Sequence, residues 1–207
     1  MEAQSPFPMA AQPEEELFDV VDAATGLPTG AVRARSLVHA EGLYHAAVHT
    51  WLLAPDGQLL LQRRAACKDS WPGRWDVSSA GHITAGDAAL PSAVRELAEE
   101  LGLAFPPARF EPLFVHLERQ ASVQKGRPFI NNEFNHVFLV SLTAAEAAAL
   151  RPGSPAFALQ ASEVSDVRWL PWREVQRLYE AGDPCIVPSG DLASYSRLFD
   201  ALHARGL

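Results

Sequence analysis

The sequence predicts a single domain of the α/β or α+β sandwich class, and three observations lead to that prediction. The chain has 207 residues, enough for one domain with a substantial core. Its composition, 48% hydrophobic and 20% charged residues, is typical of a folded protein rather than a disordered chain. Groups of strand-like segments are separated by helix-like segments, and no internal repeat is visible. We therefore expect one layered domain.

The N-terminal part predicts a tail followed by paired strands. Residues 1–16 contain three prolines and the run EEE, so we expect a mobile tail there and a domain that spans 17–207. LFDVVD at 17–22 is a strand candidate, and ATGLPTG at 24–30 is a turn by its glycine and proline content. Residues 45–64 read as two strands around a Pro-Asp-Gly turn, which predicts a hairpin.

The middle of the chain predicts a loop, a short strand and then a helix. WPGRWDVSSAGHI at 71–83 provides the loop and the strand. The helix runs from about Leu90 to Leu101, and Gly102 stands where a left-handed C-terminal cap is expected. Pro91 fits this helix only in its first turn, so its start is less well defined than its end.

The second half of the chain supplies further strands and helices. Strands are expected at 110–120, 134–142 and 167–172, with a connection that contains glycine and proline between the first two. Helices are expected at 144–150, 173–182 and 191–204, the last of them amphipathic.

Charge and cysteine content exclude several classes of partner. The net charge of −8 would repel nucleic-acid polymers and anionic membranes, although a local basic pocket could still bind a small phosphate ligand. Cys67 and Cys185 are too few for a disulfide framework, so reduced thiols are expected. There is no apolar run of eighteen residues and no targeting signal, and we therefore expect a cytoplasmic protein. The sequence does not indicate an oligomeric state.

The helix at 90–101 carries the first functional signal. Its apolar residues form one stripe, while Glu96, Glu99 and Glu100 fall within about 100° of arc on another side. Like charges at this spacing repel, and only Arg95 is available to neutralise them. Carboxylate oxygens are ligands that suit Mg²⁺ or Mn²⁺. The helix is therefore either a metal site or a solvated acidic face.

The spacing around this helix resembles the signature of the Nudix hydrolases, G-x5-E-x7-R-E-U-x-E-E-x-G-U, where U is apolar. Here Gly81 is followed by Asp87 in the place of the first glutamate, and then by RELAEELGL at 95–103. Only the aspartate departs from the pattern, and it is still acidic. The resemblance implies a single-domain α/β/α sandwich with a mixed central sheet and hydrolysis of a diphosphate linked to a group X.

The same resemblance implies roles for individual residues. Glu96, Glu99 and Glu100 would bind Mg²⁺, with Mn²⁺ as a substitute, and the carbonyl of Gly81 would be a further ligand. Arg95 would orient a catalytic glutamate, and Asp87 would be structural at the helix start. The general base would be Glu96 or else Glu133, which could also be a metal ligand.

Within this family, residues 18–180 resemble the subgroup related to isopentenyl-diphosphate isomerase. QRRAACKDSWPGRWDVSSAGH and NNEF carry this resemblance. The isomerases hold a metal with histidines and two glutamates; His39, His45 and His82 fall on the histidine positions, although His39 and His45 are one residue too close. Ala80 stands at the place of the catalytic cysteine, and Asn131 replaces one glutamate. These changes favour hydrolysis over isomerisation.

The substrate is expected to be a small diphosphate held by cations. Arg64 and Lys68, and more weakly Arg35, fall where isomerase-like proteins grip a diphosphate, and His82 is a further substrate-binding candidate. Tyr44, His49 and Phe129 are candidates to line the pocket for X. Isopentenyl or dimethylallyl diphosphate and nucleoside di- or triphosphates remain alternative substrates. An isomerase-like protein and a non-catalytic diphosphate-binding module are the alternative functions.

Overall fold

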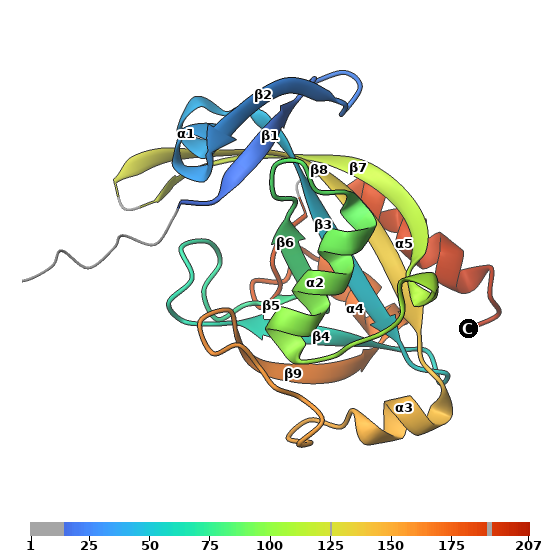
Figure 1. Ribbon diagram of the computed structural model, residues 1–207. Coiled ribbons are helices and arrows are strands. Elements are labelled where there is room, and N and C mark those ends of the chain that lie inside the picture. The colour runs from blue at the N-terminus through green and yellow to red at the C-terminus, as the bar shows by residue number, and fades with distance from the viewer. Residues whose placement is uncertain (1–14, 125, 190–191) are drawn as a thin grey trace, which may run out of the picture.

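A mixed β-sheet lies between helices on its two faces in the computed structural model, which describes residues 15–124, 126–189 and 192–207 (Figure 1). Residues 1–14 of the predicted tail lie outside this range. The strands are β1 (Leu17–Val21), β2 (Pro28–Ala34), β3 (Tyr44–Leu53), β4 (Gln58–Arg64), β5 (Trp75–Asp76), β6 (Ser79–His82), β7 (Glu111–Gln124), β8 (Arg127–Ser141) and β9 (Val164–Pro171). The helices are α1 (Arg35–Glu41), α2 (Ala89–Leu101), α3 (Ala144–Ala149), α4 (Trp172–Glu180) and α5 (Leu192–His203), with a 3₁₀ turn at Pro107–Arg109.

Strand β3 is the centre of the larger sheet. It runs parallel to β8 along its whole length, and β8 pairs with the antiparallel edge strand β7. On the other side β3 pairs with β6 over Ala47–Thr50 but with β4 only at Leu53. The neighbours β6 and β4 therefore diverge, and β9 and β5 extend the sheet beyond β4. Strands β1 and β2 form a separate two-stranded sheet.

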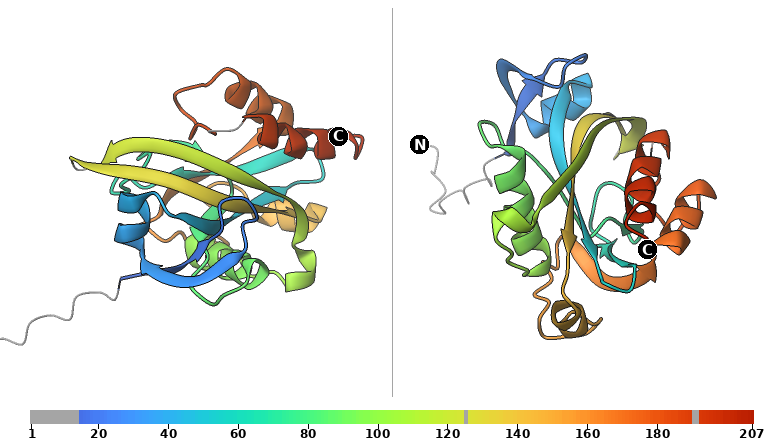
Figure 2. Two further views of the ribbon diagram at one scale, coloured as in Figure 1. Left: turned by 90° about the horizontal axis from the view of Figure 1, so that it is seen from above. Right: turned by 90° about the vertical axis from the view of Figure 1, so that its right-hand side faces the viewer.

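Each face of the large sheet packs on its own helices. Helix α2 covers one face, while α4 and α5 cover the other (Figure 2). Because side chains alternate along β3, Trp51 and Leu53 join the core under α4 and α5. Val48 and Leu52 pack instead with Leu97 of α2. Together these three layers are the predicted α/β/α sandwich with a mixed central sheet.

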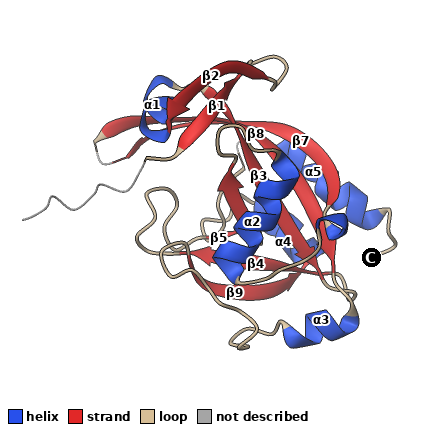
Figure 3. Ribbon diagram, in the orientation of Figure 1, coloured by secondary structure: helices blue, strands red, loops and turns tan. Residues whose placement is uncertain are grey.

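Most of the predicted elements occur where they were expected (Figure 3). The hairpin of β3 and β4 turns at Asp56 and Gly57, and Gly57 has a φ of 80°. Helix α2 begins at Ala89, so Pro91 does lie in its first turn, and Gly102 ends it with a φ of 73°. Strand β1 and helices α3, α4 and α5 also match their predicted segments.

Two parts of the fold differ from the prediction. The connection expected between β7 and β8 is largely strand, because the pairing of these strands continues to Gln124 and Arg127. The segment 28–41, for which no regular structure was predicted beyond a turn, forms β2 and α1. Helix α1 has seven residues and no side-chain N-cap, so little in its local sequence predicts a helix. No described helix is long and apolar enough to cross a membrane.

Candidate active site

Ten of the residues singled out in the sequence line one cavity of about 300 Å³. They are Arg35, Arg64, Lys68, Gly81, His82, Arg95, Glu96, Glu99, Glu100 and Glu133. The cavity lies between β6 and β4, which diverge from each other, so residues from several elements can reach it. His49 and Phe129 also line it, whereas the hydroxyl of Tyr44 accepts a hydrogen bond from Arg119 Nε (3.3 Å) and does not line the cavity.

Glu96 lies directly against the backbone of β6. A Cβ atom placed on Gly81 would be 2.1 Å from Glu96 Cδ, so only glycine leaves room for the carboxylate. Burial raises the pKa of Glu96 to about 7, although the nearby Arg95 lowers it. The carboxylate and the carbonyl-bearing backbone of Gly81 are thus held together on one wall of the cavity.

Glu100 is the most buried of the three helix glutamates, with only 4% of its surface exposed. Its Oε2 accepts hydrogen bonds from the Ala80 N–H (3.1 Å) and from Gln62 Nε2 (3.3 Å). Burial nevertheless raises the pKa of Glu100 to about 8. Burial makes the negative charge of these two carboxylates unfavourable, and a divalent cation beside them would offset that cost. Glu96 and Glu100 therefore suit a hard metal ion.

Arg95 connects the remaining charges of the helix. Its Nη1 lies 2.8 Å from Glu96 Oε1 and 3.2 Å from Glu99 Oε2, and its Nη2 donates to the carbonyl of His82 (3.4 Å). These contacts link Glu96 to the backbone of β6, and the positioning role expected of Arg95 stays a prediction. Glu99 is about half exposed and is the most accessible of the three carboxylates.

The cations expected to grip phosphate are each paired with a carboxylate. Arg64 Nη1 lies 3.0 Å from Asp76 Oδ2, Lys68 pairs with Glu163, and Arg35 Nη1 lies 2.9 Å from Glu16 Oε2. Among the described residues that line the cavity, eight carry a carboxylate and four a cationic side chain. The cavity is therefore acidic overall, and phosphate oxygens would have to share or replace these carboxylate partners.

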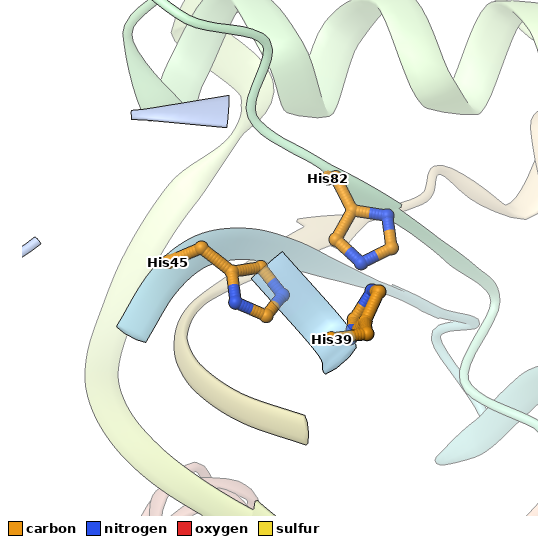
Figure 4. A group of neighbouring side chains, drawn as sticks. All are labelled: His39, His45 and His82. Atoms are coloured by element: carbon orange, nitrogen blue, oxygen red, sulfur yellow. The ribbon is translucent and has the colours of Figure 1, made fainter. Parts of the chain in front are cut away.

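A second group of possible metal ligands lies beside the helix glutamates. Ligand nitrogens of His39, His45 and His82 all lie within 4.8 Å of one another (Figure 4). Glu133 Oε1 lies 3.0 Å from His82 Nε2 and 3.4 Å from His45 Nε2. We call these four residues the histidine cluster. They come from α1, β3, β6 and β8, so the close spacing of His39 and His45 in the sequence does not keep them apart.

Burial disfavours the charged forms of His39 and His82 in the histidine cluster, because it lowers the pKa of both. Phe18 stacks on His82 and His45, with ring centroids 4.5 and 5.4 Å apart, and Phe129 stacks on His39. Burial and the neighbouring histidines lower the pKa of His39 to about 4. Burial also favours a raised pKa for Glu133, but its close contacts with His45 and His82 outweigh it and hold that pKa well below its ordinary value. Imidazole nitrogens together with a carboxylate suit Zn²⁺ or Mn²⁺.

Several residues at the site carried no usable signal in the sequence. Glu16, Asp76 and Glu163 are distant in sequence from one another, and only the fold places each beside a predicted phosphate-binding cation. The two cysteines are both exposed, and neither lines the cavity. The described cavity thus has Ala80 and no thiol near the position where an isomerase would need one.

Comparison with known proteins gives a consistent result. The NUDIX domain family model matches residues 43–188. Nudix hydrolase 3 of Arabidopsis thaliana is 47% identical over 193 residues, which cover 92% of this chain and 24% of that protein. The chain therefore spans about a quarter of the length of this relative. The isopentenyl-diphosphate Delta-isomerase of Shigella flexneri is 30% identical over 158 residues, or 76% of this chain and 79% of the isomerase.

The structure comparison supports the same fold. The crystal structure of DR0079 from Deinococcus radiodurans superposes with a TM-score of 0.62 and 21% sequence identity. The match covers 88% of this chain and 98% of that one, so the three-layer architecture is shared over nearly the whole domain.

Proposed function

Because the chain belongs to the NUDIX domain family, we propose that it is a divalent-metal-dependent hydrolase that cleaves the phosphoanhydride bond of a small diphosphate compound. One observation carries this proposal: Glu96, which lies against Gly81, and the buried Glu100 both have raised pKa values and line the same cavity as Arg64 and Lys68. Acidic and basic groups that converge in this way suit a metal and a phosphate chain bound side by side.

The helix carboxylates would hold the metal. Glu96, Glu99 and Glu100, with the carbonyl of Gly81, offer only oxygen ligands, which favours Mg²⁺ and allows Mn²⁺. When bound, such an ion neutralises the charge that develops on the diphosphate oxygens and lowers the pKa of water. Arg95 keeps Glu96 oriented through the 2.8 Å contact and acts as a positioning residue.

Two residues compete for the role of general base. Glu96 has a pKa of about 7, in the range where a carboxylate can accept a proton near neutral pH. Glu133 is hydrogen-bonded within the histidine cluster, and its lowered pKa makes it a weaker base. We therefore assign proton abstraction to Glu96 and regard Glu133 as a residue that holds the histidine cluster in place.

The phosphate chain would be held by Arg64, Lys68 and Arg35, with His82 beside them. Substrates of two kinds fit this arrangement: isopentenyl or dimethylallyl diphosphate, and nucleoside di- or triphosphates. The histidine cluster is the observation that favours isomerase chemistry instead. Ala80, however, provides no group that could move a proton at a prenyl carbon, which favours hydrolysis.

A ³¹P NMR time course tests the proposed function. The purified protein is incubated with Mg²⁺ and isopentenyl diphosphate in one sample and a nucleoside diphosphate in another. We expect monophosphate and orthophosphate to appear in at least one of them. The double variant Glu99→Gln/Glu100→Gln should lose at least about 100-fold of that rate while its circular dichroism is unchanged. Metal-dependent turnover that survives this double change would show that the site is assigned to the wrong residues.

A further inference from the structure

The inner end of the cavity is built by one face of the sheet and by α4 and α5. In the strand register Ala80 lies opposite His49, and Ala47 lies opposite Asn135. Since side chains alternate along a strand and paired residues share a face, all four point to the same side of the sheet. Tyr195 of α5 covers this side, and its hydroxyl lies 2.9 Å from His49 Nδ1. These five residues, all of which line the cavity, define what we call the inner chamber.

Asn135 is the unusual member of the inner chamber. Its side chain is fully buried, and neither its Oδ1 nor its Nδ2 has a hydrogen-bond partner among the residues that the structure describes. A primary amide offers one acceptor and two donors, and leaving them unpaired in a buried place is costly. The Asn135 amide therefore has no hydrogen-bonding partner in the inner chamber among the described residues.

Such a partner would have to enter through the cavity, because Asn135 is one of the residues that line it. Ala47 and Ala80 contribute only methyl groups, so no long side chain separates Asn135 from the cavity. His49, on the same face of the sheet as Asn135, is hydrogen-bonded to the Tyr195 hydroxyl of α5, which fixes polar atoms beside the amide. A hydroxyl group can accept from Asn135 Nδ2 and donate to Oδ1 together, whereas a hydrocarbon group would leave both unpaired.

We propose that the inner chamber binds the group X of the diphosphate substrate and selects a hydroxylated X over a hydrocarbon one, with Asn135 as the residue that determines this specificity. The inference rests on the proposed hydrolase function and narrows its substrate class. Prenyl diphosphates are then poor substrates, and diphosphates of hydroxylated compounds are good ones.

Two diphosphates with the same carbon skeleton test this inference. Isopentenyl diphosphate and 3-hydroxy-3-methylbutyl diphosphate differ by the addition of water across the double bond, so X gains a hydroxyl with little change in size. We expect kcat/KM of the wild-type protein to be at least about tenfold higher for the hydroxylated compound, since a site that hydrogen-bonds a hydroxyl discriminates strongly against its absence. An equal or lower kcat/KM for the hydroxylated compound would overturn the inference and leave the proposed hydrolase activity intact.

Variants of three residues test whether Asn135 causes the preference for the hydroxylated compound. Asn135→Leu should abolish the preference by lowering kcat/KM for the hydroxylated compound and not for isopentenyl diphosphate. Tyr195→Phe, which removes only a hydroxyl, should reduce the preference in a protein that remains folded. Asn132→Leu is the matched control, because the Asn132 side chain donates to the Gly42 carbonyl (2.7 Å) and does not line the cavity. Its preference should equal that of the wild type, and a preference unchanged in all three variants would overturn the assignment.

A binding measurement distinguishes a failure of this inference from a failure of the proposed hydrolase function. If neither compound is hydrolysed, the proposed activity fails on both, but calorimetric titration with Mg²⁺ still compares their affinities. Tighter binding of the hydroxylated compound, lost in Asn135→Leu, would support the inner chamber as a polar subsite. Equal binding, or none of either compound, would overturn it.

Discussion

At the scale of single residues, the contact between Gly81 and Glu96 has a direct mechanistic meaning. Strand β6 can approach α2 this closely only where a residue has no side chain. The φ of Gly81 is not in the left-handed region, so its backbone conformation is open to alanine as well. Position 81 therefore needs a glycine because the Glu96 carboxylate fills the space beside it, and not because of its backbone conformation.

The substitution Gly81→Ala should therefore affect catalysis far more than stability. The new methyl group displaces the end of the flexible Glu96 side chain, so the free energy of unfolding should change by less than about 1 kcal/mol. Moving this carboxylate by about 1 Å should lower kcat roughly 100-fold. Steady-state kinetics and thermal melts check both parts. In the double variant with Glu96→Gln, Gly81→Ala should add little further loss, and additive losses would contradict this reading.

The buried glutamates predict how the stability of the metal-free protein depends on pH. Burial raises the pKa values of Glu96 and Glu100 from 4.5 to about 7 and about 8. A carboxyl with a raised pKa binds its proton more tightly in the folded state, so folding is disfavoured as the pH rises above the unfolded value. With EDTA present, the melting temperature should fall by roughly 5 °C between about pH 5 and pH 8. Glu100→Gln should flatten this profile, and an unchanged slope would contradict the prediction.

The sequence predicted the members of the site but not their partners. The spacing from Gly81 to Glu100 fixes a loop and helix in which the carboxylates must converge, so their grouping follows from local geometry. Lys68 and Glu163 are 95 residues apart, and their ion pair depends on how β9 returns to β4. Asn135 gave no indication that it would be buried without a partner, because that depends on the packing of three strands and α5.

At the scale of elements, the end of α2 determines where its glutamates point. Gly102 ends the helix in the left-handed conformation, and its N–H donates to the carbonyl of Ala98 (3.0 Å). A Cβ atom on Gly102 would lie 2.6 Å from Ala158 Cβ and 2.8 Å from the backbone nitrogen of Ala158. The C-terminal end of α2 and the loop at Ala158 therefore meet so closely that there is no room for a side chain at position 102.

Gly102→Ala should destabilise the protein by about 2–4 kcal/mol, since the backbone strain and the clash with a neighbouring main chain add together. Gly153→Ala is the matched control: Gly153 has a φ of 78°, but nothing lies within 4 Å of its Cβ position. It should cost only about 1 kcal/mol. Urea unfolding of both variants measures the difference, and equal losses would show that the contact with Ala158 contributes nothing.

Local patterns predicted most elements, and the failures have physical causes. Strands β3 and β4 are long, apolar and joined by a Pro-Asp-Gly turn, so their hairpin is visible in the sequence. Strand β2 is mostly exposed, and α1 buries only Val38 and His39, so neither shows a clear hydrophobic period. The parallel pairing of β3 with β8 joins segments about 90 residues apart, which no local pattern can indicate.

At the scale of the whole molecule, the histidine cluster joins the N-terminal elements to the central sheet. His39 lies on α1, next to the small sheet of β1 and β2, while the other members of the cluster lie on β3, β6 and β8. Phe18 of β1 is fully buried against two of the imidazoles. A transition metal bound here would tie these elements together.

Loading the protein with Zn²⁺ or Mn²⁺ should therefore raise its melting temperature, and a chelator should reverse the change. His39→Ala should reduce the effect, whereas His203→Ala, near the C-terminal end of α5, should not. Elemental analysis after gel filtration should find less metal in Zn²⁺-loaded His39→Ala than in the Zn²⁺-loaded wild type. A melting temperature that does not respond to either metal would contradict this role of the cluster.

The excess of carboxylates in the cavity has a consequence for the order of events during turnover. A diphosphate without a bound metal carries several negative charges, and the carboxylates of the cavity would repel it. The cations Arg64 and Lys68 are already paired with carboxylates and so attract it only weakly. Diphosphate already complexed with Mg²⁺ has lost most of that charge and can approach. Under the proposed hydrolase function, the concentration of magnesium would then limit the rate as much as that of the substrate, and a diphosphate complexed with Mg²⁺ would outcompete the free one.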